Sequence, residues 1–175
     1  DAPRDMPKVL NQAKGTDVRG IIITHGHYDH VEGFQYIKQN TKIKTFIHSE
    51  DSTSLPSPAD FYLIDKQEIQ LGHHIIRVLH TPGHTAGGVS LVIGSHLFSG
   101  DTLFPGGPGR TGSPQDFRQI LDSISNKLLA LPDNTPVYPG HGLNTTIGKS
   151  RLEYQDFISR KHPQDLFGEI VWSKT

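Results

Sequence analysis

One hexapeptide restricts the fold more than any other part of the chain. It reads His25-Gly26-His27-Tyr28-Asp29-His30 and directly follows the apolar run Ile21-Ile22-Ile23. A short β-branched run bounded by a glycine-containing turn is typical of a buried strand. In an extended segment, residues two apart point to the same side, so His25, His27 and Asp29 share a face. The segment therefore predicts a strand, a loop rich in potential metal ligands, and a helix into whose first turn His30 points.

Three further donors occupy isolated turns, each after an apolar run. They are His84 in Thr81-Pro82-Gly83-His84-Thr85, Asp101 in Gly100-Asp101-Thr102, and His141 in Tyr138-Pro139-Gly140-His141-Gly142. Strand ends are the usual location of site residues in layered α/β sheets. Taken singly, His84 could be a polar turn residue and Asp101 a turn cap. Together with the hexapeptide they indicate a site. The remaining histidines are interpreted as surface or hydrogen-bonded residues, namely His48, His73, His74, His80, His96 and His162.

Seven candidate ligands are too many for one catalytic zinc, which needs three protein ligands and an open position. We expect two ions that share one carboxylate. The first would be held by His25, His27 and His84, the second by Asp29, His30 and His141, and Asp101 would bridge them together with a water-derived hydroxide. The chain has no cysteine, so the ligands must be nitrogen and oxygen. Such a site lowers the pKa of bound water to about 7 and favours a developing oxyanion.

Hydrophobic periodicity predicts the other elements. Helices are expected over 5–14, 29–40, 114–131 and 148–160, and strands over 19–24, 43–48, 64–71, 74–79, 89–93, 96–99 and 137–138. Residues 49–60 are expected to form a surface loop, and residues 105–113 an irregular one. Ser113 is the expected N-cap of the third helix, with Pro114 at its first position. Mixed strands and helices without a repeat or linker predict one layered α/β domain over residues 1–175.

Composition excludes several classes of function. The formal net charge is −1, and hydrophobic residues make up 34% of the chain. No basic surface suited to nucleic acid is expected, and no apolar stretch is long enough to span a bilayer. The lack of cysteine suits a cytoplasmic protein. The chain opens at Asp1 rather than at a methionine, so we expect a natural N-terminal segment before it.

Four stretches resemble the metallo-β-lactamase superfamily, and within it the glyoxalase II-like (hydroxyacylglutathione hydrolase-like) single-domain hydrolases. They are THGHYDHVEG at 24–33, TPGHTAGGVSL at 81–91, FSGDTLFPGGPGRTG at 98–112 and VYPGHGLNTTIG at 137–148. The resemblance implies a four-layer αβ/βα sandwich with the metal site at one edge of two sheets, here without the N-terminal strands of the family. It implies the ligand assignment given above, with zinc as the metal and iron or manganese as alternatives.

The resemblance also implies an activity, which is hydrolysis of a hydroxyacyl-glutathione-like thioester by a metal-bridging hydroxide. Asp29 would orient this hydroxide as well as bind metal. Arg110 would either bind a substrate carboxylate or stabilise its loop by a hydrogen bond. Arg110 and Leu143 stand where larger glyoxalase II enzymes carry a lysine and a tyrosine, so the acyl group and thiol carrier stay open. The expected partner is a small-molecule thioester, and the oligomeric state is not specified.

Other activities share this pattern. A persulfide dioxygenase would use a single iron held by His25, His84 and Asp101, and a lactonase would use the same two-metal core. A binding module without turnover is a third alternative. A β-lactamase is disfavoured because lactamases of this fold lack an aspartate at the position of Asp101. An RNA-processing phosphodiesterase is disfavoured by the balanced charge.

Overall fold

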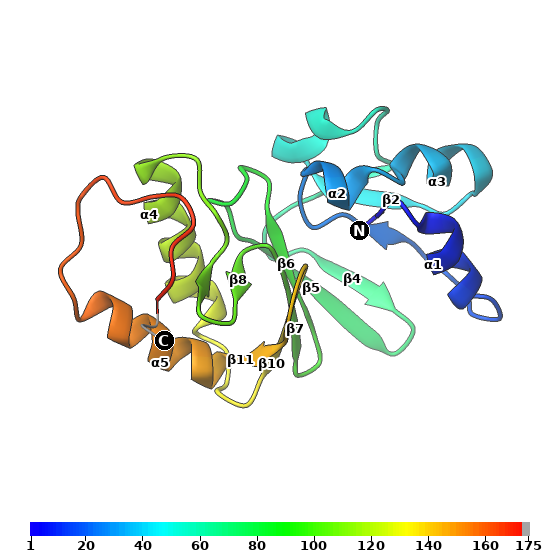
Figure 1. The fold of residues 1–175 in the computed structure, drawn as a ribbon. Helices are drawn as coiled ribbons and strands as arrows, with labels where there is room; N and C mark the ends of the chain where they lie inside the picture. Colours follow the sequence, from blue (N-terminus) through cyan, green and yellow to red (C-terminus); the bar gives the residue numbers. More distant parts are fainter. Residues whose placement is uncertain (173–175) are drawn as a thin grey trace.

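The computed structural model, which describes residues 1–172, contains two β-sheets with helices on their outer sides (Figure 1). The smaller sheet is parallel, and its order is β1 (Ile21–Ile22), β2 (Thr45–His48) and β3 (Phe61–Leu63). The larger sheet has the order β11 (Thr145–Thr146), β10 (Pro136–Pro139), β7 (His96–Gly100), β6 (Val89–Ile93), β5 (His74–His80) and β4 (Glu68–Leu71). A short ribbon pairs β8 (Leu103–Phe104) with β9 (Gly107–Pro108).

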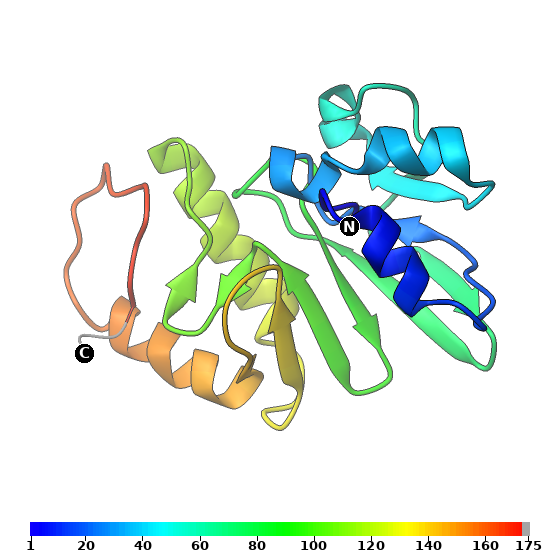
Figure 2. The ribbon, with the colours of Figure 1, turned by 45° about the vertical axis from the view of Figure 1, so that its right-hand side comes forward.

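The helices form the two outer layers. Helices α1 (Met6–Gln12) and α3 (Phe34–Asn40) lie beside the small sheet, and α4 (Pro114–Ser123) and α5 (Ile147–Ile158) lie beside the large one (Figure 2). The order of layers is therefore helix, sheet, sheet, helix. This arrangement confirms the sandwich predicted from the sequence.

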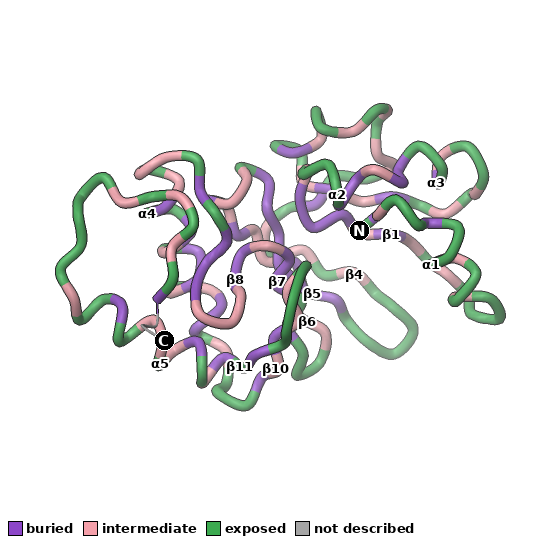
Figure 3. Tube along the Cα trace, viewed as in Figure 1, coloured by how far each residue is buried: buried purple, intermediate pink, exposed green. Residues whose placement is uncertain are grey.

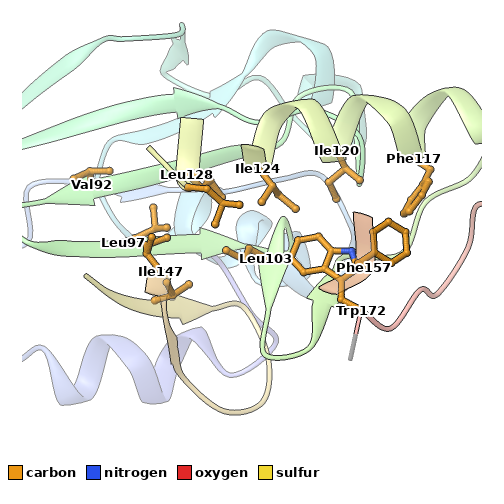
Figure 4. Packing of buried hydrophobic residues seen from close by; sticks show 12 residues of the cluster. Val92, Leu97, Leu103, Phe117, Ile120, Ile124, Leu128, Ile147, Phe157 and Trp172 are labelled. Atoms are coloured by element: carbon orange, nitrogen blue, oxygen red, sulfur yellow. The ribbon is translucent and has the colours of Figure 1, made fainter. Parts of the chain in front are cut away.

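Three hydrophobic clusters fill the three spaces between the layers. In β1 the side chains alternate, so that Ile21 and Ile23 pack toward the helices while Ile22 packs toward the other sheet. Between the sheets lie residues such as Val78 and Leu91. The largest cluster joins the large sheet to α4 and α5 (Figure 4), and its labelled members are Val92, Leu97, Leu103, Phe117, Ile120, Ile124, Leu128, Ile147, Phe157 and Trp172.

The start of α4 follows the sequence prediction. The backbone N–H of Asp116 donates to Ser113 Oγ at 3.2 Å, and Pro114 occupies the first turn. The α-helical hydrogen bonding ends earlier than predicted, because the turn Ile124–Leu128 is wound as a π-helix. This wider turn still buries Ile124 and Leu128 against the sheet.

Other predicted boundaries were wrong. The single helix predicted over 29–40 is two helices, α2 (Tyr28–Val31) and α3, because the Gly33 N–H donates to the Ala2 carbonyl. The loop predicted over 49–60 begins with a 3₁₀ helix, Ser49–Ser54, that carries a buried aspartate. The strand predicted over 64–71 starts only at Glu68, because Asp65 accepts the His80 N–H and shapes a turn before it.

Burial is uneven along the chain (Figure 3). The tip of the β4–β5 hairpin is exposed, whereas β6 is buried along most of its length. Within residues 1–172 the structure holds no helix with both the length and the apolar character needed to cross a bilayer.

Trp172 offers a test of the largest cluster. Its side chain is 0% exposed, and its ring centroid lies 5.2 Å from that of Tyr154. We expect Trp172→Ala to lower the free energy of unfolding by about 3–5 kcal/mol, because a large buried side chain leaves a cavity. Its neighbour Val171 is 64% exposed, so Val171→Ala should change the value by less than about 0.5 kcal/mol. Urea denaturation monitored by far-UV circular dichroism, which reports on the backbone, measures both free energies. Equal effects of the two substitutions would contradict this packing.

Candidate metal centre

Strand directions bring the donor-bearing turns to one edge of the large sheet. Strands β5 and β7 are each antiparallel to β6, and β10 is parallel to β7, so all three run the same way. Their carboxyl ends lead directly to His84, Asp101 and His141. The small sheet joins this edge because the Val89 N–H donates to the Thr24 carbonyl at 2.8 Å. The segment that carries His25 is thereby placed against the others.

The structure brings six of the predicted donors into two groups. The first contains His25, His27 and His84, and the second contains Asp29, His30 and His141; the donor atoms of each group lie within 4.8 Å of one another. In the first group the ring centroids of His27 and His84 are 4.4 Å apart. In the second, His141 Nε2 lies 2.9 Å from Asp29 Oδ2. These two groups match the sets predicted from the sequence, and a third group, which overlaps both, consists of His25, His30 and Asp101.

Asp101 lies between the groups. Its Oδ2 is 3.6 Å from His84 Nε2 in the first group and 3.6 Å from His141 Nε2 in the second. Its Oδ1 is 3.7 Å from His30 Nε2. A carboxylate placed in this way can contact cations on both sides.

Unpaired buried atoms test whether these residues fit metal ions. Among residues 1–172, His25 Nε2, His84 Nε2 and Asp101 Oδ1 are buried without a hydrogen-bond partner. Buried polar atoms normally have a partner, because an unpaired one keeps the cost of its lost hydration. All three point into the same space and are good ligand atoms for a divalent ion. The donor set therefore fits a bound metal.

Hydrogen bonds on the far side of the rings orient the imidazoles. His84 Nδ1 donates to the Arg110 carbonyl at 2.8 Å, and His30 Nδ1 donates to Asp1 Oδ2 at 2.9 Å. A carbonyl or a carboxylate only accepts, so Nδ1 carries the proton and Nε2 keeps its lone pair. His25 Nδ1 lies 3.2 Å from Thr24 Oγ1.

Burial keeps these rings neutral. Desolvation, followed by the nearby rings of His30, His84 and His27, lowers the pKa of His25 to about 2. Burial likewise lowers the pKa of His30, although the carboxylates of Asp101 and Asp29 act in the opposite direction. It also lowers the pKa of His84, against the hydrogen bond to the Arg110 carbonyl. Neutral imidazole is the form that binds metal.

The centre has a buried floor and an open rim. His25 and His30 are buried, whereas His27, Asp29 and His141 are exposed. A cavity of about 400 Å³ opens beside the centre. Its lining comprises His84, Asp101, the loop from Phe104 to Arg110, and Glu169, Ile170 and Val171.

Arg110 makes a different contact from the one considered in the sequence. Its backbone carbonyl holds His84, while its exposed guanidinium makes no hydrogen bond with any residue of the described part of the chain. Arg110 is one of the residues that line the cavity, and no hydrogen bond within the described residues occupies its side chain. The other predicted histidine assignments agree with the structure: His80 Nε2 bonds the Ala86 carbonyl, and His162 Nε2 bonds that of Phe157.

Two aspartates near the centre were missed by sequence reasoning. Asp1 accepts the Thr24 N–H at 2.6 Å in addition to its contact with His30. Asp51, in the segment predicted as a surface loop, is buried and contacts two of the ligand-bearing loops. No local pattern marks either residue, because their partners are distant in the sequence.

Comparison with known proteins gives a consistent result. The family model described as "Metallo-beta-lactamase superfamily" matches residues 2–141. The hydroxyacylglutathione hydrolase GloC of Haemophilus influenzae is 33% identical over 156 residues, covering 77% of this chain and 74% of GloC. The probable polyketide biosynthesis zinc-dependent hydrolase BaeB of Bacillus velezensis is 32% identical over 176 residues, covering 86% of this chain and 75% of BaeB. The structure of TTHA1623 in a di-iron-bound form superposes with a TM-score of 0.71 at 29% identity, covering 86% of this chain and 84% of that one.

Metal content tests the geometry of the centre. We expect zinc-saturated protein to retain two ions per chain after dialysis, because the two predicted donor groups share no residue. His84→Ala and His141→Ala should each retain about one, and Asp101→Ala should lose affinity at both positions. Elemental analysis measures this, with His73→Ala as a control because His73 is exposed and outside both groups. Unchanged metal content in the first three variants would rule out the assignment.

Proposed function

The chain belongs to the metallo-β-lactamase superfamily of metal-dependent hydrolases, and on that premise we propose that it hydrolyses a thioester at a centre that binds two divalent metal ions. The observation that carries the two-metal part is the gathering of six donors in two groups on either side of Asp101. The thioester is supported by the likeness to GloC, which is named a hydroxyacylglutathione hydrolase. Zinc is the proposed metal, as in the name of BaeB.

The proposed hydrolysis uses the bound metal ions and Asp29. When bound, the metal ions would supply Lewis acidity and make a water molecule nucleophilic at neutral pH. Asp29 lies on the open rim, so its carboxylate can bind metal and also accept a hydrogen bond from the attacking water. The water oxygen adds to the thioester carbonyl carbon and the carbon–sulfur bond breaks. One water proton goes to the departing sulfur and the other to solvent, so a carboxylate, a thiol and a proton are released. No separate side-chain base is required.

Arg110 is proposed to bind the substrate. Arg110 lines the same cavity as His84 and Asp101, and its guanidinium has no hydrogen bond within the described residues. A guanidinium binds a carboxylate through two parallel hydrogen bonds. A substrate carboxylate held there would place the thioester beside the centre.

Arg110→Ala tests this role. We expect KM to rise about 10- to 100-fold with a smaller change in kcat, because hydrogen bonds to a charged group contribute roughly 1.5–3 kcal/mol. The KM of Arg110→Lys should lie between those of the parent protein and Arg110→Ala, since lysine keeps the charge but loses the bidentate geometry. Steady-state kinetics with thioesters that carry or lack a carboxylate provides the measurement. An equal effect of Arg110→Ala on both substrates would contradict carboxylate binding.

The alternatives are separated by a substrate panel. A single-iron persulfide dioxygenase would use His25, His84 and Asp101 and leave Asp29, His30 and His141 without a role, although these three lie together. We expect metal-loaded protein to hydrolyse a hydroxyacyl-glutathione thioester faster than a lactone, and to consume no oxygen with a thiol persulfide. His27→Ala and Asp101→Ala should lower kcat about 100-fold or more. A content of one iron per chain together with oxygen uptake would contradict the proposal, and so would full thioesterase activity in both His27→Ala and Asp101→Ala.

A further inference from the structure

Asp51 lies outside the seven donors but contacts the loops that carry three of them. We propose that Asp51 is a positioning residue that holds the loops of His25, His27 and His84 together so that the first donor group forms. It belongs to the 3₁₀ helix Ser49–Ser54, which follows β2, and its side chain is buried at 5% exposure. The inference rests on the proposed metal centre but does not depend on which substrate is hydrolysed.

Three short hydrogen bonds define the contact. Asp51 Oδ2 accepts the Gly26 N–H at 2.7 Å and the Thr85 hydroxyl at 2.7 Å, and Oδ1 accepts the Gly87 N–H at 2.7 Å. Gly26 lies between His25 and His27 in the sequence, and Thr85 directly follows His84. One carboxylate therefore joins the two loops that supply the whole first group.

Two glycines allow this close approach. A Cβ on Gly87 would lie 2.6 Å from Asp51 N and 2.7 Å from its Oδ1, and a Cβ on Gly26 would lie 2.6 Å from Ser54 Oγ. Neither glycine has a positive φ, so the reason for glycine is space rather than backbone conformation. Both loops are packed against the 3₁₀ helix at the points where Asp51 binds them.

The partners of these hydrogen bonds distinguish positioning of the loops from simple stabilisation of the 3₁₀ helix. All three cross to other loops, 25 to 36 residues away in the sequence, and none serves Asp51's own segment. The second donor group receives no contact of this kind from Asp51. A metal centre requires its ligands to be held within about 0.5 Å of the binding geometry. Hydrogen bonds that fix the ligand loops therefore favour metal binding.

Asparagine is an informative substitution because it keeps the size of the side chain. Each carboxylate oxygen of Asp51 accepts a backbone N–H. Asparagine has only one acceptor oxygen, so its NH₂ group must face either the Gly26 N–H or the Gly87 N–H. In either orientation one backbone hydrogen bond between Asp51 and a donor loop is therefore lost.

The test measures zinc affinity by competition with a chromophoric chelator in two backgrounds. The His141→Ala chain keeps only the first donor group intact, and the His84→Ala chain keeps only the second. We expect Asp51→Asn to weaken zinc binding about 10- to 100-fold in the first background and less than about 3-fold in the second. Equal effects in the two backgrounds, or none in either, would overturn the proposal. Absence of zinc binding by the parent chain would instead refute the proposed metal centre.

Asp60→Asn is the matched control for loss of stability. Asp60 also accepts several hydrogen bonds, from Lys38, Lys44 and Thr45, but it touches neither donor loop. We expect it to lower the melting temperature of the metal-free protein while leaving zinc affinity unchanged in both backgrounds. A loss of affinity in Asp60→Asn equal to that in Asp51→Asn would show a merely structural effect.

Thr85 provides a second route if Asp51→Asn does not fold. Thr85→Val keeps both backbone bonds to Asp51 and removes only the hydroxyl bond, whereas Thr85→Ser keeps the hydroxyl. Zinc affinity in the His141→Ala background should fall about 3- to 10-fold in the valine variant and stay near the parent value in the serine variant. Equal zinc affinities of the two variants would contradict the positioning role of Asp51.

Discussion

The centre depends on the cost of burying lone pairs without partners. The carboxylate of Asp101 lies among four imidazole rings. Its Oδ2 is near the Nε2 atoms of His25, His84 and His141, and its buried, unpaired Oδ1 is near that of His30. The distances of 3.6–3.9 Å are too long for hydrogen bonds. Burial also lowers the pKa of His25 and His84, so these two imidazoles are uncharged and cannot balance the carboxylate. Cations in this space would satisfy both kinds of atom at once, which makes the arrangement costly without metal and favourable with it.

The two sheets determine where the buried donor atoms gather. Strands β5, β7 and β10 deliver their carboxyl ends to one edge, and β1 reaches the same edge through the bond between Val89 and Thr24. Each sheet is backed by its own helices and hydrophobic cluster, and a third cluster joins the sheets. The ligand loops are short extensions of this rigid base. The donors therefore converge because the layers pack, and little freedom of the loops has to be lost on metal binding.

The sequence predicted the donors but not their supports, for a physical reason. Each donor stands in a turn after an apolar strand, which is a local pattern with a local meaning. Asp1 and Asp51 act across 29 and 36 residues, and only the packed fold brings them to His30 and Gly87. The same holds for element boundaries. The predicted helix over 29–40 breaks at a contact between Gly33 and the Ala2 carbonyl, which the periodicity of that helix does not contain.

Substrate access is coupled to the core in a similar way. The segment from Gly168 to Trp172 runs along the glycine-rich loop, because Thr111 N–H donates to the Gly168 carbonyl and Trp172 N–H donates to the Gly106 carbonyl. Trp172 is buried in the largest cluster, so the side chains before it are held at the cavity wall. Glu169 in this wall and Arg110 line the same cavity. The lining thus includes one acidic and one basic residue together with the apolar residues Ile170 and Val171. A substrate of the proposed reaction would have to fit this lining as well as reach the metal centre. The wall is held in place by a segment that one buried tryptophan anchors.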